Sequence, residues 1–179
     1  MNEAKMLGEG EIGILPTDTI YGLVASAHLP EAVERVYLAK GRAPEKPCII
    51  LISSVEDLHS FGISNELISS KALGEYWPGP VSIIFPCTDE ALRYLHRGTN
   101  TLAFRLPKDE WLVFFLEVSG PVIAPSANPQ GLPPAVNVEE ARNYFGNQVN
   151  FYIDKGERKG NPSKVISMGK DGSVEVLRA

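Results

Sequence analysis

The sequence predicts an α/β protein with one open, mixed sheet, formed by a single domain that spans residues 1–179. Apolar runs typical of strands alternate with segments of helical spacing along most of the chain, and several strand-like runs follow one another near its end. The composition, 44% hydrophobic and 22% charged, is ordinary for a globular protein and provides for a sizeable core. No internal repeat, low-complexity tract or linker divides the chain. We therefore expect one mixed sheet in one domain.

The first third of the chain predicts strands around one well-defined helix. After a short helical start, the expected elements are a strand at 11–16, a strand at 23–27, a helix at 30–40 and a strand at 48–52. Pro30 stands in the first turn, where proline is favoured, and Gly41 stands where a left-handed cap ends a helix. The run from Cys48 to Ile52 is continuously apolar, which indicates a strand covered on both faces.

The remainder of the chain alternates helices with strands. We expect helices at 65–76, 111–118 and 138–145, strands at 81–86, 101–107, 121–125 and near 151–153, and two final strands up to residue 178. The segment Trp77-Pro78-Gly79-Pro80 breaks the first of these helices sharply. A tryptophan beside two prolines is more typical of a packed corner than of a ligand platform.

Charge and cysteine content exclude several classes of protein. The formal net charge of −5 argues against a generally basic nucleic-acid binder, so an anion site must be local. Cys48 and Cys87 are far apart in apolar surroundings, which suggests neither a zinc cluster nor a disulfide framework and fits a reducing compartment. No apolar run approaches the ~20 residues that span a bilayer, and the acidic N-terminus has no secretory segment. We expect a cytoplasmic protein without a membrane partner.

The stretch Lys40-Gly41-Arg42-Ala43-Pro44-Glu45-Lys46-Pro47 has the character of an anion site. Lys40 continues the core-facing stripe of the preceding helix, although it could instead be a last-turn cation that complements the helix dipole. Arg42 and Lys46 follow on a loop stiffened by two prolines. A fixed backbone favours an arginine that must meet an oxyanion.

Two other segments and one arginine extend this candidate site. Thr17 to Gly22 follows a buried strand, where open α/β sheets bind ligands, although a simple turn would have the same composition. Arg105 interrupts an apolar strand and must pair with either a structural carboxylate or a ligand. The proline-rich segment from Ser126 to Pro134 offers small hydrogen-bonding groups, or else forms a rigid surface turn.

These groups favour phosphoryl or nucleotidyl chemistry. The sequence contains no phosphate-binding loop of the Walker type, no dinucleotide motif, no zinc-protease motif and no nucleophile elbow. Fixed cations and hydroxyls at strand ends are suited to positioning anions and neutralising developing charge. Mg²⁺, if used, would be carried mostly by the phosphates of ATP, and we predict no protein metal site.

The motifs taken together resemble the YrdC family of threonylcarbamoyl-AMP synthases. The resemblance rests on Pro16-Thr17-Asp18-Thr19-Ile20-Tyr21-Gly22-Leu23, Lys40-Gly41-Arg42, Trp77-Pro78-Gly79-Pro80, Arg105 and Ser126-Ala127-Asn128, in this order. It implies an open twisted sheet of the YrdC type with a large concave cavity. It also implies conversion of L-threonine, bicarbonate and ATP to threonylcarbamoyl-adenylate and pyrophosphate, for N6-threonylcarbamoylation of adenosine 37 in tRNA.

The resemblance further implies a role for individual residues. The residues that would face threonine are Thr19, Arg105, Ala124 and Ser163. Those that would face ATP are Arg42, Lys46, Thr101, Ser126, Pro134 and Arg178. Lys40 and Asn128 would lie, with Arg42, at the reacting carbamate and phosphate groups. Threonylcarbamoyl-transferase proteins are the expected partners, with tRNA or double-stranded RNA as further ones.

The chain departs from the longer family members at two positions and in length. Those members have a histidine where Leu51 stands, Ser-Thr-Val where Ser163-Lys164-Val165 stands, and an additional C-terminal domain. Asn161-Pro162-Ser163 resembles the short single-domain bacterial form, which is the form we expect here.

Two other functions compete with this one. A double-stranded RNA-binding module without catalysis would use the basic cluster of Lys155, Arg158, Lys159 and Lys164, against the net charge of −5. A carbamoyl-adenylate-handling domain, similar to one in hydrogenase-maturation proteins, would belong to a much longer chain with zinc-finger-like segments. Pyrophosphate release and the mass of the adenylate would separate these functions.

Overall fold

The computed structural model describes residues 2–69, 71–169 and 173–178. Its strands are β1 (Gly13–Pro16), β2 (Tyr21–Ser26), β3 (Ile49–Leu51), β4 (Val81–Pro86), β5 (Thr101–Arg105), β6 (Val122–Ile123), β7 (Phe151–Tyr152), β8 (Lys164–Met168) and β9 (Val174–Arg178). Its α-helices are α1 (Asn2–Gly8), α2 (Pro30–Lys40), α3 (Asn65–Ile68), α4 (Lys71–Tyr76), α5 (Arg93–His96), α6 (Glu110–Ser119) and α7 (Val138–Phe145). Short 3₁₀ turns occupy Val55–Phe61, Glu90–Leu92 and Gly146–Gln148.

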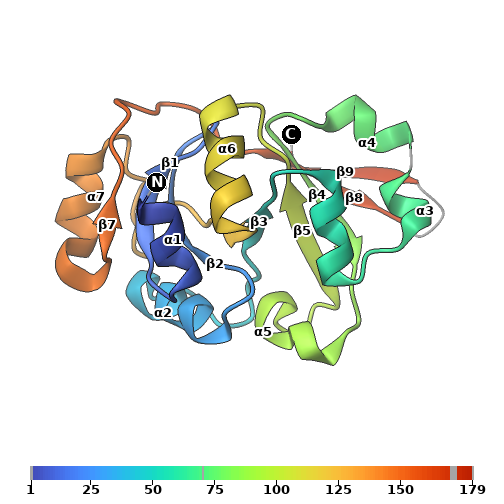
Figure 1. Ribbon diagram of the computed structural model, residues 1–179, viewed down its shortest axis with the longest axis horizontal. Coiled ribbons are helices and arrows are strands. Elements are labelled where there is room, and N and C mark those ends of the chain that lie inside the picture. Colours follow the sequence, from blue (N-terminus) through green and yellow to red (C-terminus); the bar gives the residue numbers. More distant parts are fainter. Residues whose placement is uncertain (1, 70, 170–172, 179) are drawn as a thin grey trace.

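Within the described residues the strands form one nine-stranded sheet, in the order β7-β1-β2-β6-β3-β5-β4-β8-β9 (Figure 1). The pairs β1/β7, β3/β5 and β4/β8 are parallel, and the other neighbouring pairs are antiparallel. The expectation of an open mixed sheet is therefore confirmed. Because neighbours in the sheet come from distant parts of the chain, loops that are far apart in sequence meet along its edges.

Alternate residues of the central strands enter two different cores. Leu15 and Val24 pack with α1 and α6, whereas their neighbours Ile14 and Leu23 enter the larger core that contains much of α2 and α7. The same alternation holds in β3, where Ile50 and Leu51 face opposite cores. This is the period of two that a strand imposes, and it confirms that the β3 run is covered on both faces.

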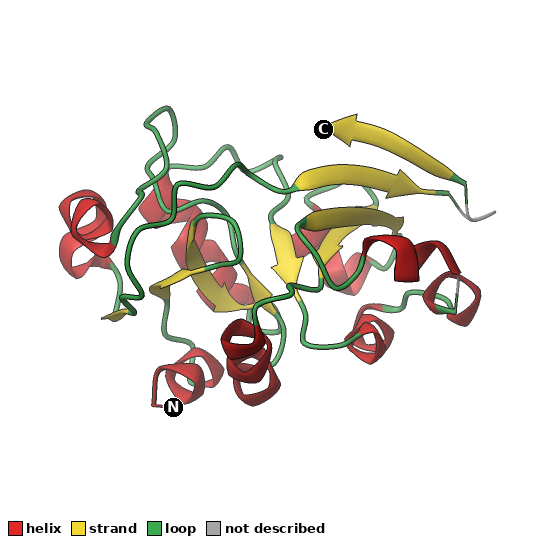
Figure 2. Ribbon diagram, turned by 90° about the horizontal axis from the view of Figure 1, so that it is seen from above, coloured by secondary structure: helices red, strands yellow, loops and turns green. Residues whose placement is uncertain are grey.

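Helices α1 and α6 and the long loops lie on different sides of the sheet. Figure 2 shows α1 and α6 on one side of the sheet, with long connecting loops and the hairpin of β8 and β9 rising on the other side. The corner at Trp77 is packed as expected: its indole Nε1 donates to the Val81 carbonyl at 2.7 Å. Among the described residues, no helix is long and apolar enough to cross a bilayer.

The predicted helix at 65–76 is the clearest error at the level of elements. The structure ends α3 at Ile68 and begins α4 at Lys71. The Ser69 hydroxyl donates to the Asn65 carbonyl at 2.7 Å, a local bond that competes with continuation of the helix. The predicted strand at 121–125 is shorter in the structure, where β6 covers only Val122–Ile123 between two prolines that lack a backbone N–H.

Candidate functional site

One cavity of about 490 Å³ lies where loops from several strands converge. The residues that line it come from the β1–β2 loop and the start of β2, the segment after α2 with the start of β3, strands β4 and β5 with the turn before β5, the segment after β6, and strands β8 and β9 with the segment before β8. They are Thr17, Thr19, Ile20, Tyr21, Gly22, Arg42, Pro47, Cys48, Ile49, Ile84, Thr99, Thr101, Ala103, Arg105, Ala124, Pro125, Ser126, Pro134, Pro162, Ser163, Val165 and Arg178.

The β1–β2 loop is organised around the hydroxyl of Thr17. This group donates its single proton to the Ile20 carbonyl at 2.7 Å. Its oxygen also accepts from the N–H groups of Thr19 and Ile20 at 3.2 and 3.3 Å. Because its proton is already used, its 3.0 Å contact with the Thr19 hydroxyl is a hydrogen bond only with Thr19 as the donor. Thr19 spends its proton in this way, so its Oγ1 offers only lone pairs to the cavity. A ligand group that binds there must be a hydrogen-bond donor.

Arg105 forms a buried ion pair at the end of β5. Its Nη2 lies 3.0 Å from Asp18 Oδ1, and both side chains are at most 9% exposed. The contact is close but poorly aligned, because among the described residues neither Asp18 oxygen nor Arg105 Nε has a hydrogen-bond partner. Burial raises the pKa of Asp18, and the Arg105 charge opposes that shift. Arg105 thus both pairs with a structural carboxylate and lines the cavity.

The end of α2 directs Arg42 into the cavity wall. Gly41 adopts the expected left-handed conformation, with φ of 60°, and its N–H is directed at the carbonyls of Leu38 and Tyr37. Arg42 Nε then donates to the Lys46 carbonyl at 2.9 Å, and its Nη2 donates to the Pro47 carbonyl at 2.8 Å. The proline-stiffened loop therefore folds around the guanidinium and fixes its direction.

Lys40 supports the wall of the cavity without lining it. Its Nζ donates to the carbonyls of Ser126 and Asn128 at 2.6 and 2.7 Å and to Asn128 Oδ1 at 3.1 Å, which uses all three ammonium protons. Burial, with a smaller contribution from the Arg42 charge, lowers the pKa of Lys40 to about 8. The Asn128 amide is also fully engaged, since Nδ2 donates to the carbonyls of Pro129 and Leu132.

The segment from Ser126 to Gln130 joins the two halves of the site. The Ala127 N–H donates to the Tyr21 carbonyl at 2.8 Å, which attaches the segment to β2. Gln130 bonds the other side: its N–H donates to the Lys40 carbonyl, and its Oε1 accepts from the Ala43 N–H, each at 2.8 Å. Residues 40–43 and 126–130 therefore hold each other in place.

A segment from Asp154 to Pro162 crosses beside the β1–β2 loop, and we call it the strap. The Tyr21 hydroxyl donates to the Gly156 carbonyl at 2.8 Å. Gly160 lies so close to the loop that a Cβ added there would be 2.3 Å from the Thr19 carbonyl oxygen. Beyond the strap, Ser163 pairs its hydroxyl with that of Ser82 at 2.8 Å, and its carbonyl accepts from Arg178. The strap therefore leads the chain to Ser163, which lines the cavity.

The structure brings most of the expected site residues to this cavity. Lining it are Thr19, Arg42, Thr101, Arg105, Ala124, Ser126, Pro134, Ser163 and Arg178. Three residues lie elsewhere. Lys40 and Asn128 were expected at the reacting groups, but their polar atoms bond to each other and to the loop behind the wall. Lys46 is exposed and is not part of the lining.

Sequence reasoning assigned no role to several supporting residues. Asp18 stands between two threonines at the end of a strand, which was a signal that it faces inward with them. Ser82 and Gln130 had no comparable signal, because their partners Ser163 and Ala43 are distant in the sequence. Thr99 contacts the nearby Thr101 hydroxyl, but it belongs to none of the motifs. The described residues contain no group of three or more His, Cys, Asp or Glu side chains able to hold a metal.

Comparison with known proteins decides the family. The family model described as "Telomere recombination" matches residues 5–179. The chain belongs to the Sua5/YciO/YrdC family. The resemblance seen in the sequence motifs is therefore confirmed.

Two relatives and one solved structure show what the chain is similar to. The threonylcarbamoyl-AMP synthase of Pyrococcus abyssi is 34% identical over 167 residues, which are 92% of this chain and 49% of that protein. The synthase of Cellvibrio japonicus is 28% identical over 165 residues, 90% of this chain and 87% of that protein. The structure of P. abyssi Sua5 complexed with L-threonine matches with a TM-score of 0.88 at 33% identity, covering 99% of this chain and 52% of that chain. The chain thus spans about half the length of the P. abyssi protein.

Proposed function

We propose that this chain is an L-threonylcarbamoyladenylate synthase, a nucleotidyltransferase that converts L-threonine, bicarbonate and ATP to threonylcarbamoyl-AMP and pyrophosphate. The observation that carries the proposal is the convergence, around one cavity of about 490 Å³, of cations and hydroxyls from distant segments in a chain of this family. The names of the P. abyssi and C. japonicus relatives support it.

The polar groups of the cavity suggest how the substrates would lie. The amino-acid carboxylate would meet Arg105, since a guanidinium binds carboxylate in a defined orientation. Its ammonium or side-chain hydroxyl would donate to Thr19 Oγ1, which has no proton of its own to offer. Arg42 would meet ATP phosphates, with Thr101, Ser126, Pro134 and Arg178 completing that side. In this arrangement each ligand group meets a partner of the opposite hydrogen-bonding type.

The reaction then needs little covalent help from the protein. The threonine ammonium first loses a proton to solvent. The resulting amine attacks the bicarbonate carbon, one amine proton leaves with the bicarbonate hydroxyl as water, and a carbamate results. A carbamate oxygen next attacks the α-phosphorus of ATP, and the bond to the β-phosphate oxygen breaks to release pyrophosphate. Both steps bring anions together, and Arg42 would offset that repulsion while the rigid wall behind it holds the geometry.

The cavity does not fit a metal ion held by the protein. Among the described residues, its lining contains no carboxylate, and Asp18 behind it is already paired with Arg105. Mg²⁺ prefers oxygen ligands and commonly binds through substrate phosphates. We therefore propose that Mg²⁺ enters only as the counterion of ATP, and we assign it no protein ligand.

The decisive experiment measures products from the purified chain. Incubated with ATP, Mg²⁺, bicarbonate and L-threonine, it should release pyrophosphate and form a species with the mass of threonylcarbamoyl-AMP. Omission of threonine or bicarbonate should abolish both products, because the described lining of the cavity contains no histidine or carboxylate that would activate a protein nucleophile to take the adenylyl group. Equal release of pyrophosphate from ATP alone would contradict the proposal.

A pair of arginine variants sharpens the same experiment. Arg42→Ala should lower kcat/KM by about 100-fold or more, as is typical when a group that stabilises developing charge is removed. Arg142→Ala is the matched control, since Arg142 lies over the Tyr152 ring and outside the cavity lining. Equal losses in both variants would indicate a general effect on the fold.

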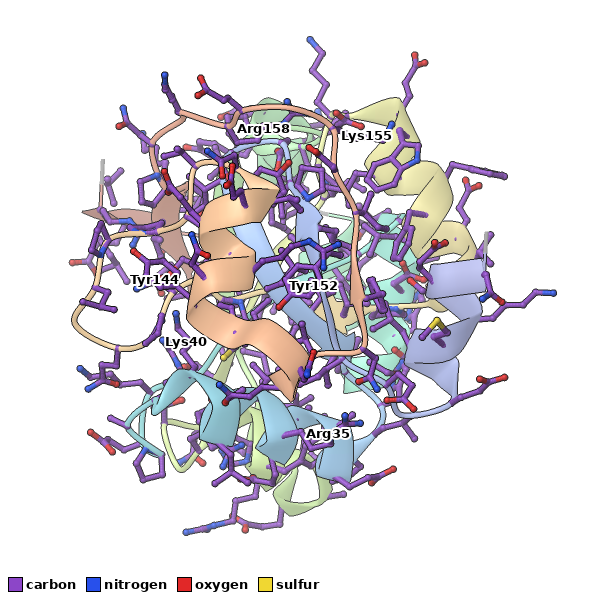
Figure 3. All side chains as sticks on the ribbon, turned by 90° about the vertical axis from the view of Figure 1, so that its left-hand side faces the viewer. Arg35, Lys40, Tyr144, Tyr152, Lys155 and Arg158 are labelled. Atoms are coloured by element: carbon purple, nitrogen blue, oxygen red, sulfur yellow. The ribbon has the colours of Figure 1, made fainter. Side chains whose placement is uncertain are left out.

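Further parts of the proposal concern context. We propose a cytoplasmic protein whose residues 1–179 form a single domain, with transferase proteins that accept the adenylate. An RNA-binding role is less well supported. Lys159 pairs with Glu157 at 2.7 Å, and Lys155 lies over the Trp111 ring. In Figure 3, Lys155 and Arg158 lie at one end of the face and Arg35 lies at the other.

A further inference from the structure

We infer that Asp18 is a positioning residue for Arg105: it fixes the guanidinium so that the free donors of Arg105 meet the carboxylate of an α-amino acid. The inference rests on the proposed function and deepens it, because it names what aligns the amino-acid subsite. Asp18 is not part of the cavity lining, so it acts through Arg105 and not on the ligand.

The first observation is that Arg105 is buried yet incompletely bonded. Only 4% of the residue is exposed, and Nη2 contacts Asp18 Oδ1 at 3.0 Å. Its Nε has no hydrogen-bond partner among the described residues, although the side chain lines the cavity. The Nε atom is itself buried, so a ligand in the cavity would reach Arg105 through its other nitrogens. A buried donor without a partner is costly, so the ion pair with Asp18 alone does not satisfy the guanidinium.

The second observation is the charge around the pair. The Asp18 carboxylate cancels the charge of Arg105, so this pair alone would attract an anion only weakly. The cation of Arg178, which also lines the cavity, lies close enough to influence Arg105. Arg178 therefore adds positive charge at this end of the cavity that the Asp18 carboxylate does not cancel, and this charge favours an anionic ligand group.

The third observation is that Asp18 belongs to the loop that carries Thr19. Thr17 holds this loop by its bonds to Ile20 and Thr19. Since Asp18 lies between these two threonines, the ion pair keeps Arg105 in register with the Thr19 oxygen. The carboxylate anchor and the acceptor for the ligand's donor group are thus held at a fixed spacing. Without Asp18, Arg105 and Thr19 would both still be present, but the distance between them would no longer be fixed.

The test compares Asp18→Asn with Asp18→Glu and with Asp109→Asn. Asparagine keeps the shape of the side chain and removes its charge. Asp109 is the matched control: it caps α6 by accepting from the Leu112 N–H, and its charge also influences Asp18. Three quantities are measured in each variant: the KM of threonine, the KM of ATP, both in pyrophosphate release, and the order parameter of the Arg105 Nε–H group from ¹⁵N relaxation. The signal of that group is assigned by its absence in Arg105→Lys.

We expect Asp18→Asn to raise the KM of threonine at least tenfold, to leave the KM of ATP within about twofold, and to lower the order parameter of Arg105. Asp18→Glu should restore part of the threonine affinity. Asp109→Asn should leave both KM values and the order parameter of Arg105 unchanged. An Arg105 that stays equally ordered in Asp18→Asn overturns the inference, whatever the activity. An equal rise in both KM values also overturns it, since that indicates a general loss of structure.

The two proposals can fail separately. If the wild-type chain forms no adenylate from threonine while the order of Arg105 falls in Asp18→Asn, the proposed function is wrong and the positioning role of Asp18 stands. If the wild-type chain is active and Arg105 keeps its order without Asp18, the positioning role is wrong and the proposed function stands.

Discussion

At the scale of single residues, the site depends on which hydroxyl holds which proton. Thr17 donates to the Ile20 carbonyl, so Thr19 must donate to Thr17 and is left with lone pairs only. A threonine ligand carries a hydroxyl donor that satisfies such an acceptor. A ligand of the same shape without the hydroxyl leaves it buried and unpaired, which costs more than the loss of an apolar contact.

This difference predicts an order of substrates. Serine lacks only the methyl group of threonine, so its kcat/KM should fall by roughly 10 to 200-fold. Valine keeps the shape and loses the hydroxyl, so its kcat/KM should fall further. The measurement is kcat/KM for the three amino acids at saturating ATP and bicarbonate. In Thr19→Val the disadvantage of valine against serine should shrink, and a wild-type protein that prefers valine to serine would exclude Thr19 as the acceptor.

Lys40 leads to a second prediction, in which activity and stability move in opposite directions. Its pKa is lowered to about 8 by burial, whereas an unfolded lysine keeps its proton to about 10.4. Between these values the unfolded state binds more protons, so the contribution of Lys40 to the free energy of unfolding rises with pH. Neutral Lys40 has only two protons for its three closest acceptors, so the loop from Ser126 to Asn128 should loosen and activity should fall.

The test measures kcat/KM and the free energy of unfolding from pH 7 to 10, with Lys40→Met as the reference. The wild-type protein should lose activity above about pH 8 while gaining stability relative to Lys40→Met. Activity that holds above about pH 8, with no gain in stability relative to Lys40→Met, would show that Lys40 stays charged throughout this range.

The site shows how far sequence reasoning reaches at this scale. Arg42 and Arg105 were identifiable because a cation on a stiffened loop, or within an apolar strand, requires an anion nearby. The position of Lys40 was predicted correctly as buried, with 4% of the residue exposed. Its partners were not predictable, since Ser126 and Asn128 are far from it in sequence. The assignment of individual ligand contacts stays a prediction.

At the scale of elements, α2 matters because its end determines the direction of Arg42. Gly41 has φ of 60°, and a Cβ added there would meet no atom within 4 Å. Gly41→Ala should therefore destabilise the fold through the backbone alone, by about 1 kcal/mol. In a domain of this size that corresponds to a fall in Tm of about 2–4 °C. The KM of ATP should rise as well, because Arg42 follows the cap directly.

Gly74 provides the matched control for this prediction. It lies within α4, where an added Cβ also meets no atom within 4 Å and no positive φ is present. Gly74→Ala should therefore raise the stability by about 0.5–1 kcal/mol and leave the KM of ATP unchanged. Thermal unfolding of both variants tests the pair, and a stabilising Gly41→Ala would show that the left-handed cap is not required.

Elements with a clear periodicity were predicted well, and those defined by a few local bonds were not. The bounds of β4 and α7 agree with the sequence prediction. The 3₁₀ turn at Val55–Phe61 was missed, although the Asp57 carboxylate accepts from the N–H groups of Ser53 and Ser54 at its start. Helix α5 covers only Arg93–His96, which is too short to show a periodic pattern.

At the scale of the whole molecule, the two cores share one sheet. Trp111 packs against the core that contains α1 and α6, whereas Trp77 belongs to the larger core on the other side of the strands. Strands β1, β2, β3 and β6 contribute alternate residues to both cores. If one core unfolds, it disrupts strands whose other face packs in the second core. The two cores should therefore unfold together in a single cooperative transition.

The two tryptophans of the chain allow this cooperativity to be measured. In Trp77→Phe and Trp111→Phe, the remaining indole reports on one core at a time. Denaturant unfolding followed by fluorescence should give one midpoint in each variant that coincides with the midpoint of helical circular dichroism for the same variant. Because the cavity is built from loops attached to both cores, addition of ATP should raise both midpoints together. Two separate midpoints within one variant would show that the cores unfold independently, and that residues 1–179 do not behave as a single domain.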